Sequence, residues 1–211
     1  DALPISIFTV LLGTGMRIGE CLGLCWNNID YANNCTVVDH SMVYYPVGED
    51  RRSERRISKP KTEAGIRKIP LLDVVKDAFE MEREEQKETG FNHSTIDGMS
   101  GFVFQNRFGD VPNPQTVNSA IKRIVASYNN DELLNAKKEK REPLLLPDFS
   151  CHHLRHTFAT RLCEAESNLK VIQSVMGHKN FETTMDVYAE ATESKKQESF
   201  INLAAKLDNI F

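Results

Sequence analysis

Residues 152–156, His-His-Leu-Arg-His, carry side-chain types that can bind and transform a phosphate group. Ser150 can cap a helix that begins immediately before them. On that helix His152 lies beside Arg155 and His156, because residues three and four positions apart share a face. Free backbone N–H groups and the helix dipole favour an anion near such an N-terminus. The segment therefore predicts an anion-binding site beside His152 and Arg155.

Two other interpretations fit this segment when it is taken alone. His152 and His156 have a spacing found in zinc sites, but such a site needs further ligands and a glutamate inside the motif, and position 153 is histidine. The simpler interpretation is a helix with histidines on its surface. The buried stripe of that helix would consist of Leu154, Phe158 and Leu162.

Five other motifs place arginine, lysine, histidine and tyrosine in a fixed order along the chain. They are TGMRIGE at 14–20, PKT at 60–62, RKIPL at 67–71, MGH at 176–178 and TTMDVY at 183–188. With the histidine segment, the order becomes Arg, Lys, His-x-x-Arg, His, Tyr. This set resembles the catalytic domain of the tyrosine recombinases, the phage-integrase family, over nearly the whole chain. The phrase TTMDVYAE looks most like integrases of Gram-positive phages and conjugative transposons.

The resemblance implies a site-specific DNA recombinase, with integration as the expected reaction. Such an enzyme cuts and rejoins strands through a 3′-phosphotyrosyl intermediate, which stores the energy of the broken bond and makes ATP unnecessary. No metal or other cofactor is expected, because arginine, histidine and lysine would meet the charge of the transition state. The lack of a carboxylate cluster like that of a two-metal nuclease fits this expectation. The alternatives are a type IB topoisomerase-like DNA-relaxing enzyme and a non-catalytic DNA-binding regulator.

Two arginines, Arg17 and Arg155, are assigned to the phosphate by this resemblance. The transition state of phosphodiester cleavage gathers negative charge on the non-bridging oxygens. Two guanidinium forks can bind those oxygens bidentately. The alternative for Arg17 is an ion pair with Glu20, a carboxylate that we expect to orient its neighbours rather than react.

The resemblance makes Tyr188 the nucleophile, with two histidines near it. A phenol of pKa about 10 is only ~0.1% ionised at pH 7, so it needs cationic neighbours or a base. His152 is the candidate base. His178 would donate a hydrogen bond to the phosphate and pack against the tyrosine helix. Tyr44 and Tyr45 lie in an expected strand and are interpreted as structural.

Lys61 is the candidate general acid that protonates the departing 5′ oxygen. In the resembling family this lysine lies on a β-hairpin that reaches into the minor groove. Lys59 is two residues away and would share the same face of an extended strand. Lys61 is preferred because Lys-Thr before Arg-x-Ile-Pro-Leu is the closer match, but Lys59 stays open.

A mostly helical α+β scaffold with a small antiparallel β-sheet or hairpin is expected to position these residues. Apolar periodicity and capping residues predict helices at 5–12, 18–25, 73–89, 113–128, 150–164, 169–176 and 183–191. Strand-forming stretches lie at 35–40, 41–45, 66–71 and 102–105. The basic strip between the second and third stretches suggests a long hairpin or a three-stranded meander. Residues 129–148 are polar and are predicted to form a loop or surface insertion.

The expected domain organisation is one catalytic domain over residues 1–211, with a core at 1–192 and a C-terminal tail helix at 193–211. The N-terminal core-binding domain that is usual in the resembling family is expected to lie outside these residues. The apolar stripe of the tail comprises Phe200, Leu203, Leu207 and Ile210. It could pack on its own domain or dock on a neighbouring protomer. The resemblance favours docking, and implies a monomer without DNA and a homotetramer on double-stranded DNA that exchanges these tails.

The composition is that of a globular protein of about one domain, with 211 residues and a net charge of −4. The charge is uneven, because residues 51–70 carry eight basic side chains and could bind a polyanion. No apolar run approaches the roughly 18–20 residues of a membrane helix, so no membrane partner is expected. Five cysteines are interpreted as reduced, mostly buried thiols of an intracellular protein. The resemblance implies a bacterial cytoplasmic protein that is nucleoid-associated when bound to DNA.

Overall fold

A computed structural model describes residues 5–47, 52–60 and 66–192 of the chain. Helices make up most of it, and a helix of residues 181–192 ends the described part. The other helices are α1 (Ile5–Thr14), α2 (Ile18–Gly23), the 3₁₀ turn η1 (Trp26–Asn28), α3 (Asp73–Thr89), α4 (Pro114–Glu139), α5 (Cys151–Ala165) and α6 (Leu169–Met176). This confirms the expected mostly helical α+β class with small antiparallel sheets.

The strands form two antiparallel sheets rather than one. They are β1 (Ile29–Asp30), β2 (Cys35–Val38), β3 (Ser41–Val47), β4 (Arg52–Ser58) and β5 (Arg67–Pro70). One sheet has the order β1-β2-β5, and β3 and β4 form a separate hairpin. Residues 52–58 of the basic strip therefore form one arm of a hairpin, whereas Arg67 and Lys68 lie on β5 in the other sheet, so the expected meander is divided. Phe102 makes only an isolated bridge to Cys25, so the strand predicted at 102–105 does not form.

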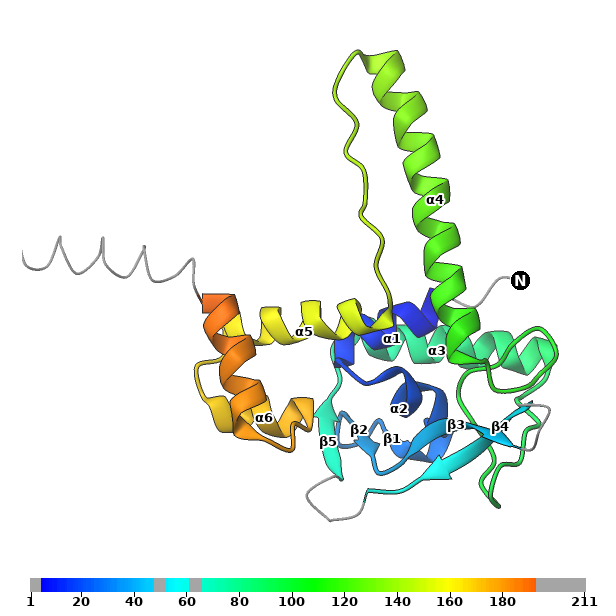
Figure 1. Ribbon diagram of the computed structural model, residues 1–211. Coiled ribbons are helices and arrows are strands. Elements are labelled where there is room, and N and C mark those ends of the chain that lie inside the picture. Colours follow the sequence, from blue (N-terminus) through cyan, green and yellow to red (C-terminus); the bar gives the residue numbers. More distant parts are fainter. Residues whose placement is uncertain (1–4, 48–51, 61–65, 193–211) are drawn as a thin grey trace, which may run out of the picture.

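The larger part of the molecule, here called the body, is built around α1. Apolar residues at helical spacing bury one face of α1 against α3 and α5, with α2 and the sheets below it (Figure 1). Large side chains that are completely buried here include Ile7, Leu11, Met16, Leu22, Phe79, Phe102 and Phe104. The body therefore fixes the turn between α1 and α2, where Arg17 is located.

A smaller cluster, here called the lobe, joins the second half of α5, α6 and the helix of 181–192. Its buried members are Ala159, Cys163, Ile172, Met176 and Ala191. Because α5 starts in the body and ends in the lobe, it connects the two (Figure 1). The chain reverses direction at Gly177, whose left-handed backbone (φ 61°) ends α6 as the sequence predicts.

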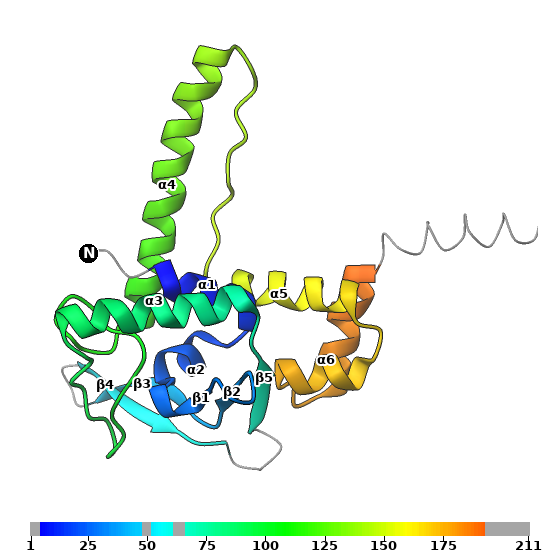
Figure 2. The ribbon, with the colours of Figure 1, turned by 180° about the vertical axis from the view of Figure 1, so that it is seen from behind.

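Helix α4 and the extended segment that follows it project from the body as an arm (Figures 1 and 2). The prediction that the helix ends near residue 128 is wrong, since it continues to Glu139. Side chains of the helix hold the returning chain: Asn129 exchanges two hydrogen bonds with the backbone of Leu146, at 2.8 and 2.9 Å. Glu132 accepts from the backbone of Leu144 and from Arg141. These local polar contacts order a segment that composition alone predicts as loop.

Asn113 caps α4 by accepting from the backbone of Gln115, as predicted. All five cysteines are free and buried. Among the described residues, no helix is long and apolar enough to cross a membrane. The apolar tail of residues 200–210 and Lys61 lie outside the described residues.

Candidate functional site

Arg17 lies at the start of α2, immediately after the turn that ends α1. Glu20, one turn later, accepts from the Arg17 backbone nitrogen at 2.8 Å and from its guanidinium at 3.1 Å. The ion pair that the sequence left as an alternative is thus present. It does not occupy the whole guanidinium, because the Arg17 side chain is 50% exposed. Arg17 therefore still presents donors to solvent.

Arg155 is buried, and this corrects the predicted orientation of α5. The buried stripe of that helix contains Cys151, Arg155 and Ala159, while the expected stripe of residues 154, 158 and 162 is only half-buried. The Arg155 guanidinium donates to the carbonyl of Gly15 at 2.5 Å and to that of Met176 at 2.6 Å. A buried charge needs such partners. Arg155 thus joins the α1–α2 turn of the body to the end of α6 in the lobe.

The charge of Arg155 is affected by its surroundings. The pKa of Arg155 is lowered to about 10, mainly by burial and also by the neighbouring positive charges of Arg17 and Arg67, while the charge of Glu20 opposes the shift. At that pKa the guanidinium is still protonated at neutral pH. The site therefore concentrates positive charge, which is the requirement for binding a phosphate.

Arg67, on β5, is a third arginine of the site, and sequence reasoning gave it no role. Its two terminal nitrogens donate to the two carboxylate oxygens of Glu20 at 3.0 and 2.7 Å. Its Nε donates to the carbonyl of Val175 at 2.9 Å. The alternation along β5 could have indicated that Arg67 is buried. Arg67 lies on the same inward face as Ile69, whereas Lys68 and Pro70 point outward.

Three consecutive carbonyl groups at the end of α6 each accept from a different arginine. Val175 accepts from Arg67, Met176 accepts from Arg155, and Gly177 accepts from Arg17 at 3.5 Å. The last carbonyls of a helix have no partner within it, and the C-terminal end of its dipole attracts cations. The end of α6 is therefore where the three guanidinium groups meet.

His178 follows this helix end directly. Its Nδ1 lies 3.1 Å from the hydroxyl of Thr184. Burial lowers the pKa of His178 to about 4, and the charges of Arg155, Arg17 and Arg67 contribute to the shift. The ring is therefore neutral at pH 7. When Nδ1 accepts from the Thr184 hydroxyl, Nε2 carries the proton and is able to donate it to a ligand.

Tyr188 and His152 lie on two different helices. Tyr188 is half-buried on the helix of 181–192 and packs against the lobe cluster. His152 is exposed on the first turn of α5, one turn before Arg155. The structure thus brings Arg17, Arg155 and His178 together, whereas His152 lies at the body end of α5 and Tyr188 lies in the lobe.

Of the two candidate lysines, only Lys59 lies within the described residues. It is exposed after β4 and lines a shallow hollow of about 580 Å³ with Ile57 and Asp97. Asp97 also holds the hairpin, accepting from the backbone of Ile57 at 2.7 Å and from Arg56 at 3.0 Å. Within the described parts of the chain, no group of three potential ligands could hold a metal ion.

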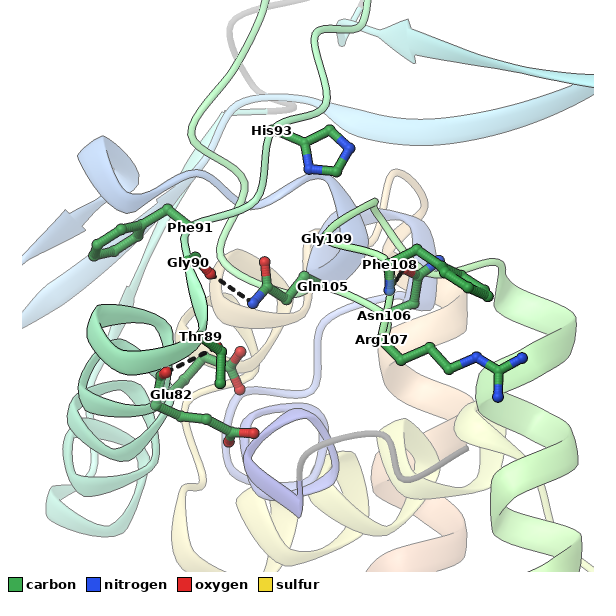
Figure 3. A pocket seen from close by; sticks show the side chains of 11 residues that line it. Glu82, Thr89, Gly90, Phe91, His93, Gln105, Asn106, Arg107, Phe108 and Gly109 are labelled. Atoms are coloured by element: carbon green, nitrogen blue, oxygen red, sulfur yellow. Dashed lines mark hydrogen bonds between the residues drawn. The ribbon is translucent and has the colours of Figure 1, made fainter.

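Another hollow, of about 480 Å³, lies at the end of α3 (Figure 3). None of the candidate catalytic residues lines it. Two residues that line this hollow, Gln105 and Gly90, are joined by a hydrogen bond from the Gln105 side chain to the Gly90 carbonyl at 2.9 Å. Phe91 and Phe108 also line the hollow and are exposed. It is a separate feature from the arginine site.

The comparisons with known proteins agree with the family resemblance of the sequence. A model of the phage integrase family matches residues 4–195. The transposase from transposon Tn916 of Enterococcus faecalis is 33% identical over 183 residues, which are 87% of this chain and 41% of the transposase. The ICEBs1 integrase of Bacillus subtilis is 27% identical over 97% of this chain and 48% of its own length.

A solved structure of the Tn1549 transposon integrase in complex with transposon right end DNA is also similar. Its TM-score is 0.75 at 32% identity, over 94% of this chain and 58% of that integrase. The chain spans about half the length of these relatives. The likeness in sequence and in fold has one explanation: the chain belongs to the phage integrase family, the tyrosine recombinases.

Proposed function

We propose that this chain acts as the catalytic domain of a site-specific DNA recombinase, an integrase of a mobile element. The observation that carries this proposal is the meeting of Arg17, Arg155 and His178 at the end of α6. The similarity to an integrase whose structure contains transposon DNA supports double-stranded DNA as the partner. The activity, the substrate and the partner are inferred for the whole protein from this part of it.

The first step of the proposed reaction is binding of one phosphodiester. Arg17 is half-exposed and can turn its free edge toward a non-bridging oxygen. The guanidinium of Arg155 has five N–H groups. Each of its two terminal nitrogens donates to one carbonyl, that of Gly15 or that of Met176, and these two hydrogen bonds fix the orientation of the guanidinium. The neutral His178 adds a donor at Nε2. Donors fixed in this way stabilise charge that develops in the transition state.

The second step is attack by the Tyr188 hydroxyl on the phosphorus. The Tyr188 oxygen forms a bond to phosphorus while the bond from phosphorus to the 5′ oxygen breaks. His152 accepts the tyrosine proton, and Lys61 gives a proton to the departing 5′ oxygen. Attack by the 5′ hydroxyl of another strand then reverses these steps and releases Tyr188.

We propose further that residues 1–192 form the catalytic core, and that residues 193–211 form a tail that docks on a neighbouring protomer. In this arrangement the active unit is a homotetramer on DNA, formed by a chain that is monomeric without DNA. The helix of 181–192, which carries Tyr188, leads directly into the tail. Docking of the tail could therefore control delivery of the nucleophile.

Replacing Tyr188 with phenylalanine should abolish covalent attachment to DNA and leave folding and DNA binding intact, because only one hydroxyl is removed. The test uses a nicked suicide duplex and a denaturing gel. Tyr128→Phe, on the exposed arm, is the matched control and should attach normally. A covalent band with the Tyr188→Phe variant would show that another residue is the nucleophile.

Arg155→Lys should cleave the suicide duplex about 10²–10³ times more slowly than the parent, although the positive charge is kept. A lysine is a point donor and cannot span two carbonyls and a phosphate. Arg161→Lys, on the same helix and paired with Glu164 at 2.9 Å, provides the control. Cleavage by the Arg155→Lys variant close to the parent rate would place Arg155 outside the phosphate clamp.

The choice between Lys61 and Lys59 can be made with a substrate whose 5′ bridging oxygen is replaced by sulfur. A thiolate leaves without a proton, so loss of the general acid no longer slows cleavage. We expect Lys61→Ala to be slow on the oxygen substrate and rescued on the sulfur substrate. Rescue of Lys59→Ala in its place would transfer the role to Lys59.

Deleting residues 197–211 should weaken assembly on DNA and deregulate cleavage more than it destabilises the chain. A helix held only by an apolar stripe is marginal in isolation, so its docking can act as a switch. Thermal unfolding and size-exclusion chromatography on DNA measure the two effects. A sharp fall in the melting temperature of the monomer, or unchanged assembly, would mean that the tail packs on its own domain.

A further inference from the structure

We propose that Arg67 is a positioning residue for strand cleavage, which joins the carboxylate that holds Arg17 to the helix end that carries His178. This inference rests on the proposed function and adds a residue to it. Arg67 is only 6% exposed and is occupied by protein partners, so it acts through its neighbours. It differs in this from Arg17, which is open to solvent.

On the side of the body, Arg67 fixes Glu20 in one orientation. Each oxygen of the carboxylate accepts from both arginines: Oε1 from the guanidinium groups of Arg17 and Arg67, and Oε2 from the Arg17 backbone and from Arg67. Burial acts to raise the pKa of Glu20, but the hydrogen bonds and charges of Arg67 and Arg17 lower it below its ordinary value. Glu20 is therefore a fixed anion that cannot turn without breaking contacts to Arg67.

On the side of the lobe, Arg67 contacts the last turn of α6. Its Nε donates to Val175, three residues before His178. Its guanidinium also lies against Gly177: a Cβ built on that glycine would come within 2.9 Å of the Arg67 terminal nitrogen. Gly177 thus meets two requirements, a positive φ and a close approach to Arg67.

The backbone of Arg67 is itself fixed by the sheet. Arg67 pairs with Val38 in the ladder between β2 and β5, and α6 packs against β5. The Arg67 side chain therefore links the sheet of the body to the end of α6 in the lobe, and its length fixes the distance between the two. A change in this connection would alter the distance between Arg17 and His178 without touching either residue.

Lysine at position 67 tests this role because it keeps the charge and loses the fork. An ammonium group cannot donate to both oxygens of Glu20 and to Val175 in the same planar geometry. Under single-turnover conditions with saturating suicide duplex, we expect Arg67→Lys to cleave about 10–10² times more slowly, since small misplacement of catalytic groups has effects of this size. The affinity for DNA should stay near that of the parent, because Arg67 is buried.

Arg141→Lys is the matched control for a merely structural effect. Arg141 also forms a two-pronged pair with a largely buried carboxylate, that of Glu132, but it does so on the arm. We expect both lysine variants to unfold at lower urea concentration, and only Arg67→Lys to lose cleavage. Parent-like cleavage by Arg67→Lys would overturn the proposal, as would equal losses of cleavage in the two variants.

A second measurement does not depend on recombinase activity. Gly177→Ala should displace the Arg67 guanidinium, so its effect on the urea midpoint should not add to that of Arg67→Lys. Gly98→Ala controls for the strain of a positive φ, because its φ is 79° and nothing lies within 4 Å of a Cβ there. Additive effects would refute the contact. If the parent forms no covalent complex, the proposed function fails. The double-mutant cycle of Gly177→Ala and Arg67→Lys still tests whether Arg67 links the body to the end of α6.

Discussion

The site depends on the three arginine–carbonyl contacts at the C-terminal end of α6. Helix ends leave carbonyls without partners, and a guanidinium group satisfies them while remaining charged. Here each arginine comes from a different element: Arg17 from the start of α2, Arg67 from β5 and Arg155 from α5. One helix end thus joins segments that are far apart in the sequence. The same contacts that hold the lobe on the body also gather the positive charge that a phosphodiester requires.

These contacts explain the properties of the residues around them. Three buried or half-buried cations repel one another, and Glu20 offsets part of that repulsion from a position between Arg17 and Arg67. Burial, together with the charges of the same cations, lowers the pKa of His178 and keeps the ring neutral at pH 7. The arginines that donate to the free carbonyls at the end of α6 therefore also influence the charge state of His178, the proposed hydrogen-bond donor. Connections of this kind make the geometry of the site sensitive to residues that never contact substrate.

The sequence predicts most helices because their apolar spacing and caps are local signals; Asn113 and Gly177 are examples. It offers Arg17, Arg155 and His178 as candidates only through the family resemblance of the motifs that contain them. The role of Arg67 cannot be predicted from local signals, because its partners Glu20 and Val175 are 47 and 108 residues away in the sequence. The second half of α4 could not be predicted from local signals either, because its stability depends on contacts with the returning chain, such as that of Asn129 with Leu146. The structure brings Arg17, Arg155 and His178 together, but the catalytic roles of these three residues, like those of Tyr188, His152 and Lys61, remain predictions for experiment.

The most direct test of this account is the pKa of the His178 imidazole, measured by NMR titration of the chain without DNA. A ring that is partly buried and faces Arg155, Arg17 and Arg67 should titrate at about 4. Burial is the largest cause of this shift and the three guanidinium charges add to it, so such a value would show that the ring is packed beside them at the end of α6 in the free protein. A pKa near the ordinary histidine value of about 6.5 would contradict the account, because it would mean that the cations and the ring are not held together in the free protein.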